Sequence, residues 1–160
     1  EALTTWRRVE KQSMPHTVLV AQRLMEGYQA AGRAPEGISL LRFYLAETAS
    51  IDLLEILFKA VLKQEGPEAA NRLVHDELRR TPTLLGLDKL LEAQLLVVPP
   101  EIREDLSFVR TLVQRYAFRL SRYQCNHCGF EARHYYWQCP GCHQWETYPP
   151  RRIEEMKLSS

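Results

Sequence analysis

The cysteines of this 160-residue chain constrain its fold more than any other feature. They follow the pattern C-x2-C-x10-C-x2-C within 18 residues near the C-terminus: Cys125, Cys128, Cys139 and Cys142. Two C-x-x-C turns can present four thiolates to one tetrahedral metal ion. Gly129 suits the positive-φ position that closes such a turn, and Pro140-Gly141 is itself a turn signal. The spacing therefore predicts one structural metal site.

Other uses of four cysteines fit this chain less well. Two disulfides are disfavoured because no secretion signal precedes the cysteines and residues 1–122 contain none. A C-x-x-C redox motif would need a neighbouring βαβ pattern, which is missing. Four thiolates complete a tetrahedral shell, so His127, His134 and His143 are expected outside it. A metal hydrolase is disfavoured, since its metal needs an open position.

Composition indicates a globular chain without a strong electrostatic bias. It is 45% hydrophobic and 26% charged, with a formal net charge of +1, so nothing global points to nucleic acid. No apolar run approaches the ~20 residues of a membrane span. Reduced cytosol is the natural compartment for free thiolates. Because the chain begins with glutamate, we expect it to be a fragment of a longer protein.

The first 120 residues are predicted to form helix after helix, paired by short turns. Pairs of helices begin at Thr17, Ile51 and Leu84, about 34 residues apart, which is the period of tetratricopeptide repeats. The expected breaks lie at Gly32 to Pro35, Gly66-Pro67, Thr81-Pro82 and Pro99-Pro100, and the last two helices are expected over Leu84 to Val98 and Glu101 to about Arg122. A plain helical bundle is the alternative.

The expected division of the chain follows from these patterns. Gly27, Gly37 and Ala70 fill the small positions of the repeat, and Pro82 the terminal one. Residues 1–15 look like the second helix of a unit whose first helix is missing. We therefore expect a mostly α chain with a tetratricopeptide-type helical-hairpin solenoid over 1–122, a rubredoxin-like or zinc-ribbon β module over 123–148, and a C-terminal tail over 149–160.

The last predicted helix carries an apolar stripe that leads almost directly into the cysteine module. The stripe comprises Ile102, Leu106, Val109, Leu112, Val113, Tyr116 and Leu120. We expect the module to pack against this end of the solenoid. Five aromatic residues lie close to its cysteines: Phe130, Tyr135, Tyr136, Trp137 and Trp145. They are expected to form a small core and a docking seam, with an exposed recognition face as the alternative.

The order of repeats and cysteine module carries a resemblance to a known family. Repeat helices run into C-x2-C-G-F…W-x-C-P-x-C-x-x-W, with Tyr135-Tyr136-Trp137 before the second pair. This combination resembles the lipopolysaccharide assembly protein B family, over essentially the whole chain, as its C-terminal part. The family's metal ligands carry over as the four cysteines. Its rubredoxin-type site implies iron, whereas zinc suits four thiolates equally well.

The resemblance implies a non-enzymatic regulator of lipopolysaccharide biosynthesis. Such proteins lie at the cytoplasmic face of the bacterial inner membrane, held by an N-terminal helix that this chain lacks. They act with a membrane-bound AAA+ protease of the FtsH type to control degradation of the deacetylase that commits precursors to lipid A. Lipopolysaccharide-assembly proteins are implied partners, while lipopolysaccharide itself and a second copy of the chain are left open.

Two other functions compete with an adaptor. A nucleic-acid-binding zinc ribbon would use the arginines of the C-terminal third, for which a solvated helix face is the simpler explanation: Arg110, Arg115, Arg119, Arg122, Arg133, Arg151 and Arg152. An electron carrier would need redox-active iron, since zinc has no redox chemistry. No phosphate loop, H-E-x-x-H motif or nucleophile elbow supports an enzyme.

Overall fold

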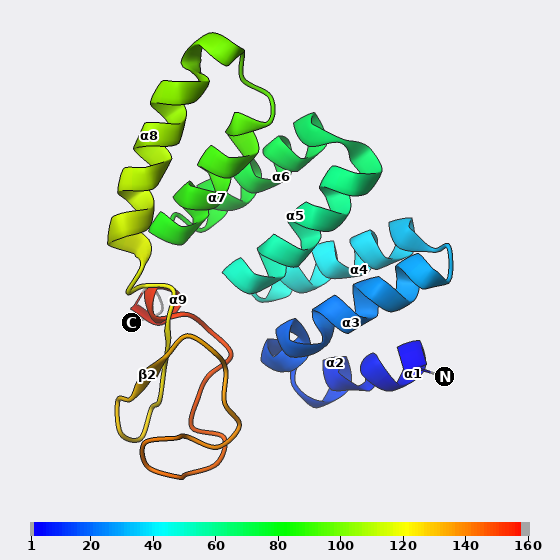
Figure 1. Ribbon diagram of the computed structural model, residues 1–160. Coiled ribbons are helices and arrows are strands. Elements are labelled where there is room, and N and C mark those ends of the chain that lie inside the picture. Colours follow the sequence, from blue (N-terminus) through cyan, green and yellow to red (C-terminus); the bar gives the residue numbers. More distant parts are fainter. Residues whose placement is uncertain (1, 158–160) are drawn as a thin grey trace.

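The computed structural model describes residues 2–157 and is predominantly helical (Figure 1). Its elements are α1 (Ala2–Trp6), α2 (Arg8–Gln12), the 3-10 helix η1 (Met14–His16), α3 (Thr17–Ala30), α4 (Ala34–Glu47), α5 (Ile51–Glu65), α6 (Pro67–Arg80), α7 (Leu84–Leu95), α8 (Pro100–Ala117), β1 (Tyr123–Gln124), β2 (Glu131–Ala132) and α9 (Ile153–Lys157). The prediction of a mostly α chain with a small C-terminal β module is confirmed. Among the described helices, none combines the length and apolarity that a membrane span requires.

Three helical hairpins, α3/α4, α5/α6 and α7/α8, stack along the chain (Figure 1). Each of these helices contacts the next, and the first helices of successive hairpins, α3, α5 and α7, also contact one another in turn. They begin at Thr17, Ile51 and Leu84, at the three predicted positions. Contacts confined to neighbouring hairpins are the pattern of a solenoid. Assignment to the tetratricopeptide class rests on the repeat period.

The helix boundaries follow from local capping. The Ser50 hydroxyl accepts a hydrogen bond from the Leu53 N–H, and the Thr83 hydroxyl accepts one from the Gly86 N–H at 2.8 Å. Such side chains satisfy N–H groups that have no partner within the helix. Between α5 and α6, Gly66 takes φ 89°, a left-handed conformation that favours glycine. Capping side chains and a left-handed glycine thus determine where the hairpins turn.

The core lies where the hairpins meet, and one glycine is required for its packing. Leu41, Leu57 and Val61 are fully buried. A β-carbon on Gly37 would lie 2.9 Å from Cβ of Tyr28, closer than side chains tolerate. Gly37 therefore lets α4 approach α3, as expected for a small position of the repeat, and Ala70 in α6 is likewise completely buried.

The structure corrects several predicted helix limits. Residues 2–12 form two short helices rather than one, and α2 ends where Ser13 adopts an extended backbone; Glu1 lies outside the described residues. Helix α7 ends at Leu95 rather than Val98, because the prolines at 99 and 100 oppose helical conformation in the residues before them. Helix α8 ends at Ala117, five residues before the predicted limit.

The apolar stripe of α8 is only partly covered in the structure. Leu106 and Val113 are partly buried and Ala117 is buried. Ile102 and Tyr116, however, remain 50% and 77% exposed. The stripe is wider than one neighbouring helix can cover, and α7 is the principal element in contact with α8.

We expect Gly37→Val to lower the free energy of unfolding by about 1–3 kcal/mol, because the added side chain overpacks the α3–α4 contact. Thermal or urea denaturation would measure the change. Ser39→Val is the matched control, since Ser39 is exposed on the same helix and such a site changes stability by only about 0.5 kcal/mol. Equal effects of the two substitutions would contradict a packing role for Gly37.

Candidate metal centre

The first C-x-x-C turn is closed by two backbone hydrogen bonds. The Gly129 N–H donates to the Cys125 carbonyl at 2.9 Å, and the Cys125 N–H donates to the Phe130 carbonyl at 3.0 Å. Gly129 takes φ 76°, which confirms the positive-φ prediction. Strands β1 and β2 flank this turn as an antiparallel pair, with Tyr123 opposite Ala132. The pair holds the start and end of the turn together.

The second turn repeats the first one without a glycine. The His143 N–H donates to the Cys139 carbonyl and the Cys139 N–H to the Gln144 carbonyl, both at 2.9 Å. His143 takes φ 59° at the position that corresponds to Gly129. A left-handed backbone costs about 1–2 kcal/mol for a residue with a side chain, so the fold imposes this turn. Gln138 adds a hydrogen bond from its side-chain amide to the His143 carbonyl.

Together the two turns bring all four sulfurs to one point. The sulfurs lie within 4.8 Å of one another, with Cys125 to Cys142 at 3.8 Å and Cys128 to Cys139 at 3.6 Å. Metal–sulfur bonds of about 2.3 Å in a tetrahedron require sulfurs about 3.8 Å apart. All four cysteines are free thiols. They are therefore positioned to bind one metal ion, and the cluster found among the described residues includes no histidine.

The surroundings of the sulfurs lower the pKa of two thiols and raise the pKa of the other two. Burial opposes ionisation of Cys125, but its hydrogen bonds with the Thr147 hydroxyl, at 3.1 Å, and with backbone N–H groups lower its pKa to about 6. The pKa of Cys139 is also lowered, because backbone N–H groups, including that of Gly141 at 3.3 Å, outweigh its burial.

The other two thiols hold their protons more tightly. The Gln144 N–H favours the Cys142 thiolate, but burial and the neighbouring sulfurs outweigh it and raise the pKa of Cys142 to about 12. The pKa of Cys128 is also raised. The Phe130 N–H lowers this pKa, but burial and the Cys139 and Cys125 sulfurs raise it by more. A bound dication would supply the positive charge that four thiolates together require.

Two tyrosines complete the core of the module. Tyr123 and Tyr148 are buried together with Cys125 and Cys139, and the Tyr148 hydroxyl donates to the Phe130 carbonyl at 3.1 Å. Tyr148, which lies six residues beyond the last cysteine, was not among the predicted site residues. Its position just after Trp145 at the end of the aromatic run was the available signal.

The expectation that the five aromatic residues form the core of the module is largely wrong. Tyr135 is partly buried and packs edge-to-face on Tyr123, with ring centroids 5.9 Å apart. The other four are 40% to 66% exposed: Phe130, Tyr136, Trp137 and Trp145. The sulfur cluster and Tyr148 fill the small interior, which leaves no room for four more rings. These four rings are therefore exposed on the module, and Trp137 forms part of the expected docking seam through its stack on His16 of η1.

An ion pair and a hydrogen bond join the module to the first turn of α5. Two nitrogens of Arg152 donate to the two carboxylate oxygens of Asp52 at 2.9 and 2.6 Å, and the Tyr123 hydroxyl donates to the same carboxylate at 2.9 Å. The Arg152 guanidinium also lies 4.1 Å from the centre of the Tyr123 ring. Bidentate arginine–carboxylate contacts fix orientation as well as distance.

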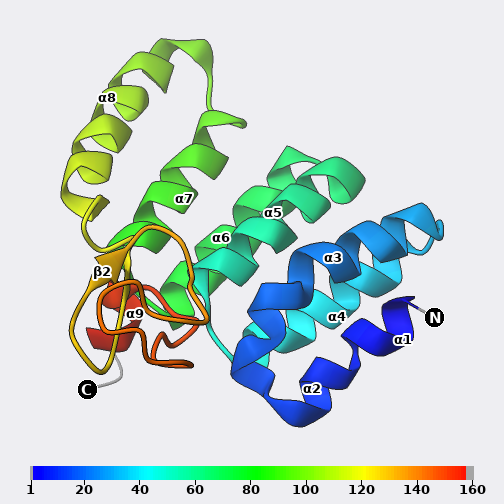
Figure 2. The same cartoon turned by 60° about the horizontal axis from the view of Figure 1, so that its bottom comes forward.

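Helix α9 fixes the same junction from the other side (Figure 2). Its Glu154 carboxylate accepts hydrogen bonds from the N–H groups of Leu84 and Leu85 at the start of α7. Glu155 accepts one from the Ile51 N–H at the start of α5. Carboxylates at helix N-termini accept hydrogen bonds from free N–H groups and interact favourably with the positive end of the helix dipole. Residues 153–157 of the predicted tail are therefore a docked helix with Ile153 buried.

The module also faces the N-terminal helices across a cleft. The rings of His16 and Trp137 stack at 5.9 Å with an interplanar angle of 8°. The cleft, of about 590 Å³, lies between residues of the α2–η1 segment and Asn126, Glu146 and Pro149 of the module. His16, which belongs to η1, is thus in contact with the module.

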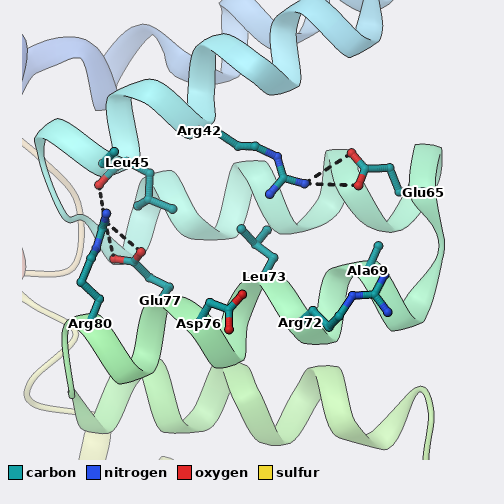
Figure 3. A pocket seen from close by; sticks show the side chains of 10 residues that line it. Arg42, Leu45, Glu65, Ala69, Arg72, Leu73, Asp76, Glu77 and Arg80 are labelled. Atoms are coloured by element: carbon teal, nitrogen blue, oxygen red, sulfur yellow. Dashed lines mark hydrogen bonds and ion pairs between the residues drawn. The ribbon is translucent and has the colours of Figure 1, made fainter.

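A second cavity, of about 410 Å³, lies between α4 and α6 and contains no residue of the metal module (Figure 3). Arg42 pairs with Glu65 at one end at 3.2 Å. At the other end Arg80 pairs with Glu77 and donates to the Leu45 carbonyl at 2.6 Å. Most of the charged side chains that line this cavity therefore form ion pairs within the solenoid.

The arginines of the C-terminal third do not form one free basic surface. Arg110 bridges Asp88 and Glu92. Arg122 pairs with Glu131 at 3.4 Å, and Arg152 is committed to Asp52. The contacts weaken the case for a nucleic-acid-binding ribbon, which needs unpaired cations along one face.

The comparisons with known proteins agree with this arrangement. Residues 123–150 match the family model described as the rubredoxin metal binding domain. Lipopolysaccharide assembly protein B of Escherichia coli strain K12 is 29% identical over 153 residues, which cover 95% of this chain and 39% of the relative. The resemblance to lipopolysaccharide assembly protein B is confirmed. The protein of that name from Haemophilus influenzae strain Rd is 26% identical over 100 residues, 62% of this chain and 25% of its own length.

The matched region fits the observed module closely. It begins at Tyr123, in β1, and extends to Pro150, two residues beyond the predicted limit of the module. It includes Thr147 and Tyr148, which contact the sulfur cluster. It ends just before Arg152 and α9, the elements that dock the module. The chain spans about two fifths of the length of the Escherichia coli lipopolysaccharide assembly protein B that it matches.

The Asp52–Arg152 contact should contribute measurably to stability. In a double-mutant cycle of Asp52→Ala and Arg152→Ala, we expect a coupling free energy of about 1–3 kcal/mol, because the pair is partly buried and bidentate. The matched control is the Arg33–Glu36 pair, which is more than half exposed and should couple more weakly, because solvent screens an exposed ion pair. Chemical denaturation measures both. Coupling no greater than that of the control pair would refute a docking role.

Metal affinity should fall steeply as the pH falls. Between about pH 7 and 8.5, Cys128 and Cys142 still carry protons in the free site, so binding releases at least two protons and affinity rises at least about 100-fold per pH unit. Competition with a zinc chelator of known pH dependence would measure the slope. A slope near zero would show that the thiols are already ionised and would contradict the division described above.

Proposed function

We propose that this chain is a non-enzymatic adaptor in lipopolysaccharide assembly. The observation that carries the proposal is its similarity to lipopolysaccharide assembly protein B over 95% of its length, with the cysteine module included in the match. Stacked helical hairpins provide extended surfaces for other proteins. The activity and partners of the longer relative are part of this proposal, because the chain corresponds to 39% of that protein.

The metal is proposed to be structural. Cys125, Cys128, Cys139 and Cys142 would hold it, and four thiolates would leave no open position for a substrate or water. Iron is favoured by the rubredoxin-type match, while zinc fits the same four sulfurs. In either case the ion supplies folding free energy to a module with a very small core. In the folded module, the Tyr123 hydroxyl donates a hydrogen bond to Asp52 of α5.

The docked module would give the adaptor one defined shape. Asp52 and the start of α7 receive contacts from Arg152 and Glu154, which lie at the end of the chain. The helical hairpins and the module would therefore move as a unit. An adaptor with this property holds two partners at a fixed distance, one on the hairpins and one on the exposed aromatic rings of the module.

The finer parts of the proposal concern partners and location. We propose that the adaptor acts at the cytoplasmic face of the bacterial inner membrane with an AAA+ protease of the FtsH type. It would thereby control degradation of the deacetylase that commits precursors to lipid A. The proposed domains are the helical repeats over 1–122 and the metal module over 123–148, followed by the docking segment.

The first test is affinity capture from detergent-solubilised Gram-negative membranes. We expect the intact chain to recover the protease or lipid A enzymes, and the Cys139→Ser/Cys142→Ser variant to lose them, because the module unfolds without its metal. Mass spectrometry of the captured proteins is the readout. Recovery of nucleic acid instead would refute the adaptor role and favour a zinc ribbon.

A control variant separates loss of metal from loss of one side chain. His134→Ser changes an exposed residue of the module and should leave capture unchanged. Elemental analysis of both variants reports metal content and distinguishes iron from zinc. Zinc alone would also exclude an electron carrier. If the double cysteine variant stays folded by circular dichroism and still captures the same proteins, the metal has no part in assembly.

A further inference from the structure

The outer face of α8 is an apolar surface that the solenoid leaves uncovered. Its large side chains are 38% to 77% exposed: Ile102, Phe108, Val109, Leu112 and Tyr116. At about 100° per residue these five lie within about 120° of the helix circumference. Leu106, Val113 and Ala117 lie beside this sector and are the more buried ones, facing α7. Helix α8 is therefore apolar on two adjacent faces.

Such a surface is unusual at the end of a solenoid. Terminal helices normally present a polar outer face, because no further repeat covers them. Helix α8 lies at the edge of the molecule with α7 on one side (Figures 1 and 2). Contiguous exposed apolar side chains of this kind mark protein–protein contacts. The outer face of α8 therefore carries five large apolar side chains, together with the charged residues Glu101 and Asp105.

The charges around this face make it complementary to itself. Glu101 and Asp105 lie on the same side of the helix in its first turns, and Arg115 lies on that side near its end. All three are exposed. When two copies of such a helix pack antiparallel, the acidic end of each meets the basic end of the other. A two-fold axis requires this relation, since residue i contacts j while j contacts i.

We propose that two copies of this chain associate through antiparallel packing of their α8 helices. The two-fold axis passes near Phe108 and Val109, at the middle of the helix. Glu101 then lies beside Arg115 of the partner subunit, and Leu112 and Tyr116 pack against the opposite half of the partner helix. The proposal does not rest on the proposed function, because it concerns a surface remote from the metal centre.

The small size of the contact favours a weak association. A helix of 18 residues is about 27 Å long, so the pair buries less than the roughly 800 Å² per partner of a standard interface. We therefore expect a dissociation constant in the micromolar range, about 1–100 µM. The dimer would therefore be populated only where the chain concentration approaches or exceeds this dissociation constant.

The test is sedimentation equilibrium of the metal-loaded chain over about 1–300 µM, which brackets that range. Leu112→Asp should weaken association at least about tenfold, because it places a charge in the centre of the contact. Ser107→Asp is the matched control, since Ser107 is exposed on the opposite side of α8 and should leave the dissociation constant unchanged. Circular dichroism checks that both variants keep their helices.

Charge reversal distinguishes the antiparallel arrangement from unspecific association. Glu101→Arg and Arg115→Glu should each weaken the dimer about fivefold or more, and the double variant should restore it. Both substitutions oppose the α8 dipole, so restoration in the double variant cannot come from a more stable helix. A chain that stays monomeric throughout, a dimer unaffected by Leu112→Asp, or a double variant weaker than both single variants would each overturn the proposal.

Discussion

The position of the metal module relative to the helical hairpins depends on one carboxylate, that of Asp52. It lies in the first turn of α5 and receives Arg152 through two hydrogen bonds and Tyr123 through a third. Tyr123 lies two residues before the first cysteine of the C-x-x-C turn, and Arg152 directly precedes α9. A single carboxylate therefore fixes both ends of the metal module, because each end supplies one of its partners. The neighbouring Glu154 and Glu155 place α9 across the starts of α5 and α7 by the same means.

This arrangement couples the metal centre to the helices through few residues. Tyr123 packs with Cys125 in the core of the module while its hydroxyl reaches α5. The position of Tyr123 depends on the β1–β2 pair, which in turn depends on the closed turn around Cys125. Loss of the metal would thus release the tyrosine from Asp52 as well as opening the turn. The thiols with raised pKa, Cys128 and Cys142, make this coupling sensitive to pH, because they must lose protons for the metal to bind.

Local patterns predicted the parts of the structure that depend on local interactions. The hairpin starts at Thr17, Ile51 and Leu84 follow from apolar periodicity and from breaks at glycine and proline, and the sulfur cluster follows from cysteine spacing. The docking of the module could not be predicted in this way. Asp52 has the pattern of an ordinary acidic residue in a first helical turn, and its partner Arg152 lies 100 residues away. His143 likewise gave no sign of a left-handed backbone, which the fold imposes through its hydrogen bond to Cys139.

The route of the chain after α8 explains why the apolar stripe and the metal module do not meet. Helix α8 ends at Ala117, and within six residues the chain reaches Tyr123, whose hydroxyl lies on Asp52 of α5. The module is therefore carried beneath the starts of α5 and α7, where α9 also binds, and away from the side of α8. An apolar stripe continuous with the module in sequence consequently stays exposed in space. Its exposure accompanies the contacts that fix the metal centre, since this module is held at the starts of α5 and α7 while the outer face of α8 stays exposed.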